Sequence, residues 1–131
     1  MREIKFRAWD KYVEKMVTEP GFIQIGGEAI RECAIYHESE SRWEDITDRI
    51  ELMQFSGLKD KNGKEIYEGD IIKNDINRLW VIEWDEKICC FFQVLYSTID
   101  KNLERMDMRF NAKEVIGNIY ENPELLGKEN E

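Results

Sequence analysis

The sequence predicts a mainly β protein with minor helix, an α+β chain made of two lobes. Short segments alternate apolar and polar residues, as residues 4–9 (IKFRAW) do, and this period of two is typical of a half-buried strand. Gly, Pro and Asn residues interrupt these segments where turns are favoured, and helical periodicity is scarce. We therefore predict an N-terminal β-rich lobe over residues 1–51 and a second, mainly β lobe over residues 52–131.

The N-terminal lobe is predicted to begin with a hairpin over residues 4–17, which turns after Asp10-Lys11. Pro20-Gly21 then breaks the chain. A short strand over residues 22–25 stops at the following glycine pair, and residues 32–36 are predicted to form another strand.

Residues 38–48 are polar and poorly periodic, and we predict a long loop or a single helical turn there. Trp43 lies within this acidic stretch. A single Trp in such a loop usually packs back onto the core. The alternative is an anchor that contacts a partner protein.

A strand is predicted over residues 50–55, where the N-terminal lobe gives way to the C-terminal lobe. The chain then reverses at Asn62-Gly63. Asn-Gly is the strongest short-range hairpin signal, because a two-residue type I′ turn needs φ > 0 at both central positions. Gly69 permits a sharp turn before the next strand, and the Asp70 carboxylate is suited to accept hydrogen bonds from nearby backbone N–H groups. Small antiparallel barrels often enter a strand in this way, so we predict that residues 52–131 form an SH3-like barrel.

Two strands over residues 79–84 and 88–95 are predicted next, joined by a turn at residues 85–87. Their aromatic side chains would supply both the core and the outer face of the barrel: Trp80, Trp84, Phe91 and Phe92.

In the rest of the chain, the secondary structure of residues 96–109 is ambiguous, whereas residues 114–127 have clear signals. Residues 96–109 allow a short amphipathic helix, because Ile99, Leu103 and Met106 are spaced at i, i+4 and i+7. Residues 114–120 form a strand. A one-turn helix closes the chain, with Asn122 at the N-cap, Pro123 at N1 and Gly127 at C′.

The charge of the chain argues against general binding to duplex nucleic acid. The 131 residues carry a net charge of −9 and no Lys/Arg cluster, whereas duplex affinity comes mainly from cations that neutralise phosphates. The acidic run of residues 38–51 is interpreted first as a solubilising face. The sharper interpretation is a face that meets a basic partner or imitates nucleic acid.

The composition also indicates the cellular compartment in which the protein is expected. No apolar run approaches the ~20 residues of a membrane span, and residues 1–11 contain no apolar signal core. Three cysteines, an odd number, do not indicate a disulfide framework. We expect a cytoplasmic protein that does not associate with membranes.

No set of residues predicts a catalytic, cofactor or metal site. The only soft metal ligands are Cys33, His37, Cys89 and Cys90, and their spacing is not that of a zinc site. Adjacent cysteines on a strand point to opposite faces, so we predict one buried and one exposed thiol at 89–90. Carboxylates are plentiful, but nothing in their spacing makes a pair converge as general acid–base chemistry requires.

Three segments carry a family likeness. Residues 1–10 (MREIKFRAWD), 52–70 (LMQFSGLKDKNGKEIYEGD) and 115–126 (VIGNIYENPELL) resemble, in this order, motifs of the YopX-like proteins of phages and prophages. The resemblance implies a phage or prophage gene product that acts in the bacterial cytoplasm, with an SH3-like barrel in its C-terminal half. It carries no catalytic or binding residue onto this chain.

We therefore expect a non-enzymatic accessory protein that acts through protein–protein contacts, with a host or phage protein as partner, and that self-associates as a homo-oligomer. Trp43 and Trp80 are the candidate contact residues. One alternative is a role related to nucleic acid, through binding by the barrel or acidic mimicry of DNA. The other is a small enzyme, which would need a deep pocket with convergent polar groups.

Overall fold

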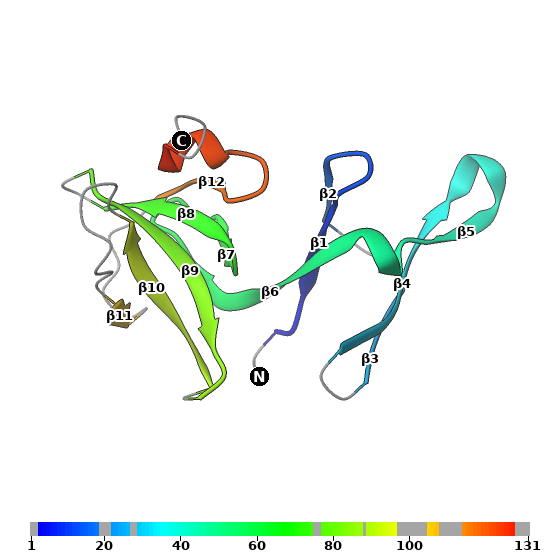
Figure 1. The fold of residues 1–131 in the computed structure, drawn as a ribbon, viewed down its shortest axis with the longest axis horizontal. Helices are drawn as coiled ribbons and strands as arrows, with labels where there is room; N and C mark the ends of the chain where they lie inside the picture. Colours follow the sequence, from blue (N-terminus) through cyan, green and yellow to red (C-terminus); the bar gives the residue numbers. More distant parts are fainter. Residues whose placement is uncertain are drawn as a thin grey trace. The chain divides into compact units, whose positions relative to one another are not determined.

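The computed structural model describes residues 3–18, 22–26, 29–74, 77–87, 89–96, 105–107 and 114–127, and the chain is mostly β-strand there (Figure 1). The strands are β1 (Phe6–Asp10), β2 (Lys15–Val17), β3 (Phe22–Gly26), β4 (Ala29–His37), β5 (Arg42–Asp45), β6 (Ile50–Lys59), β7 (Glu65–Tyr67), β8 (Asp70–Lys73), β9 (Leu79–Asp85), β10 (Cys90–Tyr96), β11 (Arg105–Asp107) and β12 (Glu114–Asn118). Helix within these residues is limited to the short 3₁₀ segments η1 (Glu38–Glu40), η2 (Thr47–Arg49) and η3 (Pro123–Leu126). The prediction of a mainly β protein is confirmed.

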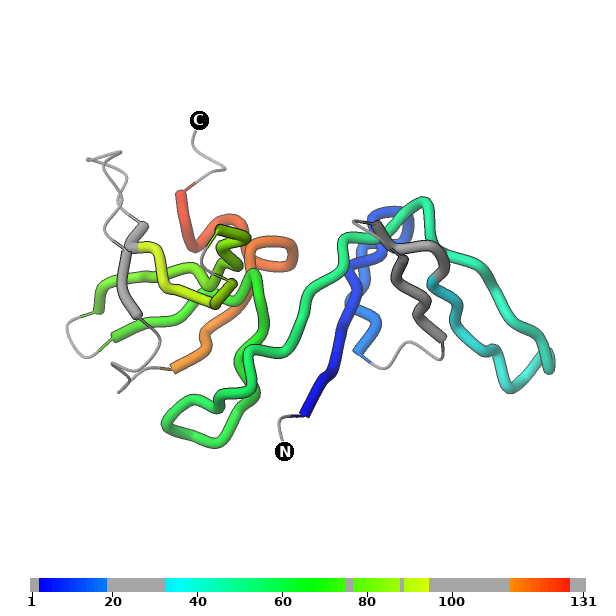
Figure 2. The backbone as a smooth tube through the Cα atoms, turned by 90° about the horizontal axis from the view of Figure 1, so that it is seen from below, coloured from blue at the N-terminus to red at the C-terminus, as the bar shows by residue number. Residues whose placement is uncertain are grey.

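The chain divides into two compact units, one formed by Lys5–Met53 and the other by Met1–Ile4 with Gln54–Glu131. Three sheets have the strand orders β2-β1-β6-β7, β3-β4-β5 and β11-β10-β9-β8-β12. Strand β6 supplies residues to both units, and Figure 2 traces it into the green hairpin that follows it.

The unit Lys5–Met53 contains the predicted N-terminal hairpin. Strands β1 and β2 are antiparallel, with Trp9 opposite Met16. A small core forms where apolar side chains of β1, β4, the η2 N-cap and β6 meet: Ala8, Cys33, Ile46 and Ile50. Strands β3 and β4 pair with Ile23 opposite Cys33, so the strands predicted at residues 22–25 and 32–36 are confirmed, the second with longer bounds.

The prediction of a loop or single helical turn over residues 38–48 is wrong for residues 42–45, which form strand β5 between the short turns η1 and η2. Strand β4 continues to His37, η1 and Ser41 reverse the chain, and β5 returns antiparallel to β4. Ser41 takes the left-handed conformation that this reversal needs (φ 50°). The sequence pattern does not predict this strand, because β5 has charged residues at three of its four positions and therefore shows no apolar alternation.

The unit containing Gln54–Glu131 has a curled antiparallel sheet. Its core is made by side chains of β7, β8, β9 and β12: Ile66, Ile72, Trp80, Ile82 and Val115. The predicted hairpin of β9 and β10 is present, with Trp84 opposite Phe91. Alternation along β9 buries Trp80 and Ile82 on the core face, and Trp84, the next residue on that face, is 39% exposed near the end of the strand.

The turn at Asn62-Gly63 differs from the predicted two-residue type I′ turn. Gly63 has a positive φ (+84°), but Asn62 does not. The Gly63 N–H donates to the Asp60 carbonyl (3.0 Å), and the Asp60 N–H donates to the Lys64 carbonyl (2.8 Å). This is a three-residue loop in which a turn is followed by a left-handed glycine. The Asp60 side chain selects it, because Oδ1 accepts the N–H groups of Asn62 and Lys64 at 2.8 Å each.

The turn before β8 forms as the sequence predicted. Gly69 has φ +85°, and Asp70 Oδ2 accepts the Tyr67 N–H at 2.8 Å. The Gly69 backbone is also a junction of the unit, because its N–H donates to the Ile82 carbonyl (2.8 Å) and its carbonyl accepts the Ile119 N–H (3.0 Å).

The last segment is a 3₁₀ turn with the predicted Pro123 start and a left-handed Gly127 (φ 74°). Asn122 occupies the predicted N-cap position, but its side chain makes no capping hydrogen bond. Its Oδ1 accepts the Asn118 N–H (3.2 Å), which folds the turn back over β12. A Cβ at Gly117 would lie 2.5 Å from this Oδ1 atom, so glycine is required for the close approach.

Two further predictions are corrected. Met106 lies in strand β11, which pairs with β10, so the helix does not include it, while Ile99 and Leu103 lie outside the described residues. Cys89 and Cys90 are both exposed, because Cys89 lies in the β9–β10 turn with a positive φ (51°) and the strand alternation starts only at Cys90.

Candidate functional site

Three polar side chains of the motif segments, those of Asp60, Asp70 and Asn118, accept hydrogen bonds from the backbone of their own fold. Asp60 binds its loop and also accepts the Val115 N–H of β12 at 2.9 Å. Asp70 holds the turn before β8, and Asn118 Oδ1 accepts the N–H groups of Tyr120 (3.0 Å) and Glu121 (2.8 Å). These contacts explain the residue types by turn geometry. A binding surface is therefore better sought between the motifs.

Of the two predicted contact residues, the structure leaves one exposed. Trp43 on β5 is 55% exposed, whereas Trp80 on β9 is 2% exposed and packs in the core. The expectation that Trp80 is an exposed contact residue is wrong, because position 80 faces inward on β9 with Ile82. The expectation that Trp43 packs back onto the core is also wrong.

Trp43 shares its surface with Tyr36, a residue that no sequence motif indicates. The two residues are directly opposite on β5 and β4, and their ring centroids are 5.1 Å apart with an interplanar angle of 49°. Tyr36 is 47% exposed. We call these two side chains the Tyr36–Trp43 patch. Cross-strand aromatic pairs stabilise a sheet, but they usually bury more of their area than this one does.

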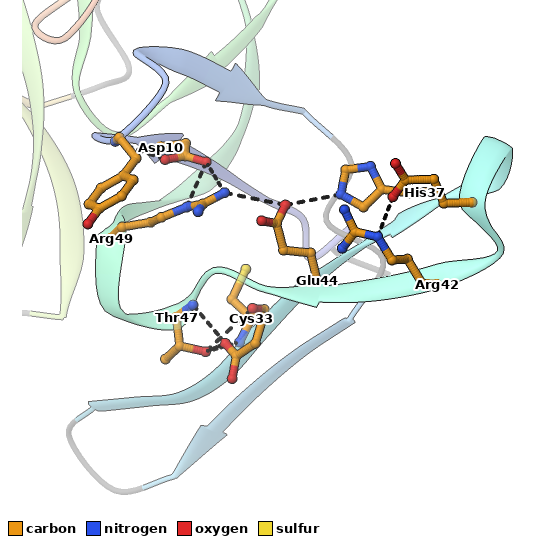
Figure 3. Close-up of polar contacts among 10 residues, drawn as sticks. Asp10, Cys33, His37, Arg42, Glu44, Thr47 and Arg49 are labelled. Atoms are coloured by element: carbon orange, nitrogen blue, oxygen red, sulfur yellow. Dashed lines mark hydrogen bonds and ion pairs between the residues drawn. The ribbon is translucent and has the colours of Figure 1, made fainter.

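The other face of the same two strands carries a chain of charged contacts, drawn in Figure 3. His37 Nε2 lies 3.0 Å from Glu44 Oε1, and the same oxygen lies 3.4 Å from Arg49 Nη2. Arg49 also contacts Asp10 Oδ2, with Nε at 3.1 Å and Nη2 at 3.0 Å from this oxygen. The chain thus connects β4 and β5 to β1 within one unit.

Asp10 is the buried end of this chain, with a side chain 2% exposed. Its Oδ1 accepts the Tyr12 N–H at 3.0 Å, and the Tyr12 ring lies under the guanidinium with Arg49 Cζ 5.4 Å from the centroid. The Arg49 carbonyl accepts the Lys11 N–H at 2.8 Å. A buried carboxylate with two guanidinium contacts on one oxygen and a backbone donor on the other is well satisfied.

Hydrogen bonds, charges and burial explain the shifted pKa values in this unit. The hydrogen bond with His37 lowers the pKa of Glu44, and the charges of Arg49, His37 and Arg42 act in the same direction against desolvation. The Thr47 hydroxyl (2.5 Å) and N–H (2.9 Å) lower the pKa of Asp45. Burial raises the pKa of the Cys33 thiol, with a further contribution from the Asp45 charge.

These groups are arranged for structure rather than for proton transfer. Each carboxylate of this chain of contacts is paired with a cation or a backbone donor, and the lowered pKa of Glu44 does not suit a general base at neutral pH. Across the described residues, no group of three or more His, Cys, Asp and Glu could hold a metal ion, and no helix is long and apolar enough to cross a membrane.

A second aromatic pair offers an internal comparison. Trp84 and Phe91 lie opposite on β9 and β10 with centroids 4.8 Å apart, and Trp84 is 39% exposed. Phe91 packs against the core of its unit, so this pair is explained by packing. Neither Tyr36 nor Trp43 belongs to the core cluster of its own unit.

Comparisons with known proteins agree on kinship. A family model described as YopX protein matches residues 5–127. The chain is similar to the crystal structure of protein EF1440 from Enterococcus faecalis, with 29% sequence identity, a TM-score of 0.58, and coverage of 96% of this chain and 99% of that one. No curated protein matches the chain.

Proposed function

This chain belongs to the YopX protein family, and we propose that it is a non-enzymatic accessory protein that acts through protein–protein contacts at the Tyr36–Trp43 patch. The observation that carries the proposal is the exposure of these two tilted, adjacent rings, 47% and 55%, which lie outside the core cluster of their unit. Exposed aromatic residues of this kind are typical anchors of protein interfaces.

Family kinship supports the remaining parts of the proposal. We infer that the protein is a phage or prophage product that acts in the cytoplasm of a bacterial host. We also infer that residues 52–131 are built as an SH3-like barrel. The curled antiparallel sheet and the tight turn at Gly69 support this finer description.

Affinity capture from host cytoplasm during prophage induction tests the contact surface. We expect the wild-type protein to retain a partner that Trp43→Ala loses, because the alanine removes the larger ring of the patch. Trp84→Ala is the matched control, since it removes an exposed ring from the other aromatic pair, and it should retain the partner. The readout is the protein recovered by each bait, identified by mass spectrometry.

A partner retained equally by all three baits would contradict the proposal. If the proteins retained in this way were mainly nucleic-acid-binding proteins, they would favour acidic mimicry of DNA instead. That alternative rests on the six carboxylates of residues 38–51.

We also propose that the protein self-associates. Strand β5 ends the order β3-β4-β5 of its sheet, and the Tyr36–Trp43 patch lies on the same hairpin. Light scattering across a concentration series is expected to give a mass above that of one chain. A strictly monomeric species at tens of micromolar concentration would refute self-association.

A further inference from the structure

The hairpin of β4 and β5 combines its exposed rings with an excess of negative charge. From Tyr36 to Asp45 it contains four carboxylates, Glu38, Glu40, Glu44 and Asp45, against one arginine. Asp45 is exposed and lies two residues from Trp43 on the same strand, hence on the same face of the sheet. Glu38, also exposed, lies in the reversal between the two strands.

The cations of this region are already bound to carboxylates of the chain. Arg42 pairs with Glu40, and Arg49 pairs with Asp10 and Glu44. His37 contacts Glu44 on the inward face. Within residues 33–51, which the structure describes throughout, neither arginine is left to neutralise the carboxylates beside the patch. Among the described residues, Glu38 and Asp45 are the carboxylates of the hairpin that no arginine pairs with, and they make the surroundings of the rings negative.

Contacts on the opposite face of β4 and β5 also hold the backbone of the Tyr36–Trp43 patch in place. Because neighbouring residues on a strand face opposite ways, His37 and Glu44 lie on the other face from Tyr36 and Trp43 and join the chain of contacts that ends at buried Asp10. The backbone under the rings is thus fixed before any partner binds. A preformed surface loses less conformational freedom on binding.

The chemistry of this surface selects its occupant. Cations are attracted to the faces of Trp and Tyr rings, and Arg stacks on them with its planar guanidinium. The chain uses this contact itself, where Arg49 lies over Tyr12. Phosphate groups of nucleic acid and anionic lipid headgroups would be repelled by the carboxylates. We propose that the Tyr36–Trp43 patch binds an arginine-bearing basic segment of a partner protein, an inference that rests on the proposed function and adds the chemistry of the partner.

The test is a titration of the full-length protein with an arginine–serine repeat peptide, followed by NMR of the Trp indole N–H signals. The signal of Trp43, assigned by its loss in Trp43→Phe, is expected to shift, whereas that of Trp84 should not. A glutamate–serine peptide of the same length should leave both signals unchanged. Raising the salt concentration should weaken binding, because the contact depends partly on charge.

Four variants separate the contributions. Trp43→Ala is expected to raise the dissociation constant about tenfold, as loss of a cation–π contact predicts. Trp43→Phe should recover part of the affinity. Glu38→Gln should raise the dissociation constant about twofold and reduce the salt dependence of binding, since only an exposed charge is removed. Trp84→Ala should bind like wild type. Equal binding by wild type and Trp43→Ala, or a shift produced by the glutamate peptide, would overturn the inference.

The two proposals fail in different ways. If the partner captured from host cytoplasm depends on Trp43 but the arginine peptide neither binds the patch nor displaces that partner, the basic-segment inference is wrong and the contact surface stands. If the peptide binds at Trp43 but no captured protein depends on Trp43, the proposed function is wrong.

Discussion

Replacing Arg49 by Met is expected to lower the free energy of unfolding by about 3 kcal/mol, because the change leaves a buried carboxylate without its cation. Asp10 is 1% exposed and receives two contacts from the guanidinium, at 3.0 and 3.1 Å. After the substitution only the Tyr12 N–H remains among its described donors. Met fills a similar volume, so the loss reports the charge rather than a cavity. Urea denaturation followed by circular dichroism measures it.

Arg42→Met is the matched control in the same unit. Arg42 also pairs with a carboxylate, that of Glu40, but both side chains are about half exposed, at 51% and 55%. An exposed pair of this kind contributes little, so we expect a change below about 1 kcal/mol. Comparable losses in the two variants would show that Asp10 does not depend on Arg49.

Replacing Asp60 by Ala is expected to cost about 2 kcal/mol, since one carboxylate accepts three backbone N–H groups. Two of them, from Asn62 and Lys64, belong to the loop, where water can replace the lost acceptor. The third is the N–H of Val115, a buried core residue of β12, and its loss leaves a buried donor without a partner. Asp48→Ala is the control, because Asp48 is exposed, and it should change stability by less than about 0.5 kcal/mol.

The contribution of Asp60 is also expected to depend on pH. Desolvation by burial alone would raise its pKa, but the N–H groups of Val115, Lys64 and Asn62, with the Lys64 charge, outweigh burial and lower it. A folded pKa below the unfolded value of about 3.9 stabilises the fold fully above that pH, and the effect is lost as pH falls through the folded pKa. The stability difference between wild type and Asp60→Ala should therefore be constant near neutral pH and shrink below about pH 4. A difference that grows on acidification would contradict this assignment.

The parts of the fold predicted best are those in which a local pattern and the tertiary environment agree. Strand β9 alternates core and outer residues, and the turn at Gly69-Asp70 needs the residue types that occupy it. The Asn62-Gly63 turn shows the limit of local rules. The dipeptide marks the reversal, but Asp60, whose carboxylate binds both the loop and β12, decides the type of turn.

Strand β5 and the Tyr36–Trp43 patch could not be predicted in the same way. A strand with three charged residues in four lacks apolar alternation, and its position depends on pairing with β4 across the reversal at Ser41. The chain from His37 to Asp10 joins residues far apart in sequence, which spacing alone cannot bring together. The equal distance of Tyr36 and Trp43 from the reversal was the one signal available.

The opposite faces of β4 and β5 give the hairpin two separate sets of evolutionary constraints. Cys33 and Ile35 contribute to the core of their unit, so changes at these positions are limited by packing. Tyr36 and Trp43 lie outside that core cluster, so substitutions at these two positions are expected to leave its packing intact. Two substitutions on the outer face could thus change the chemistry of this surface while the scaffold stays the same.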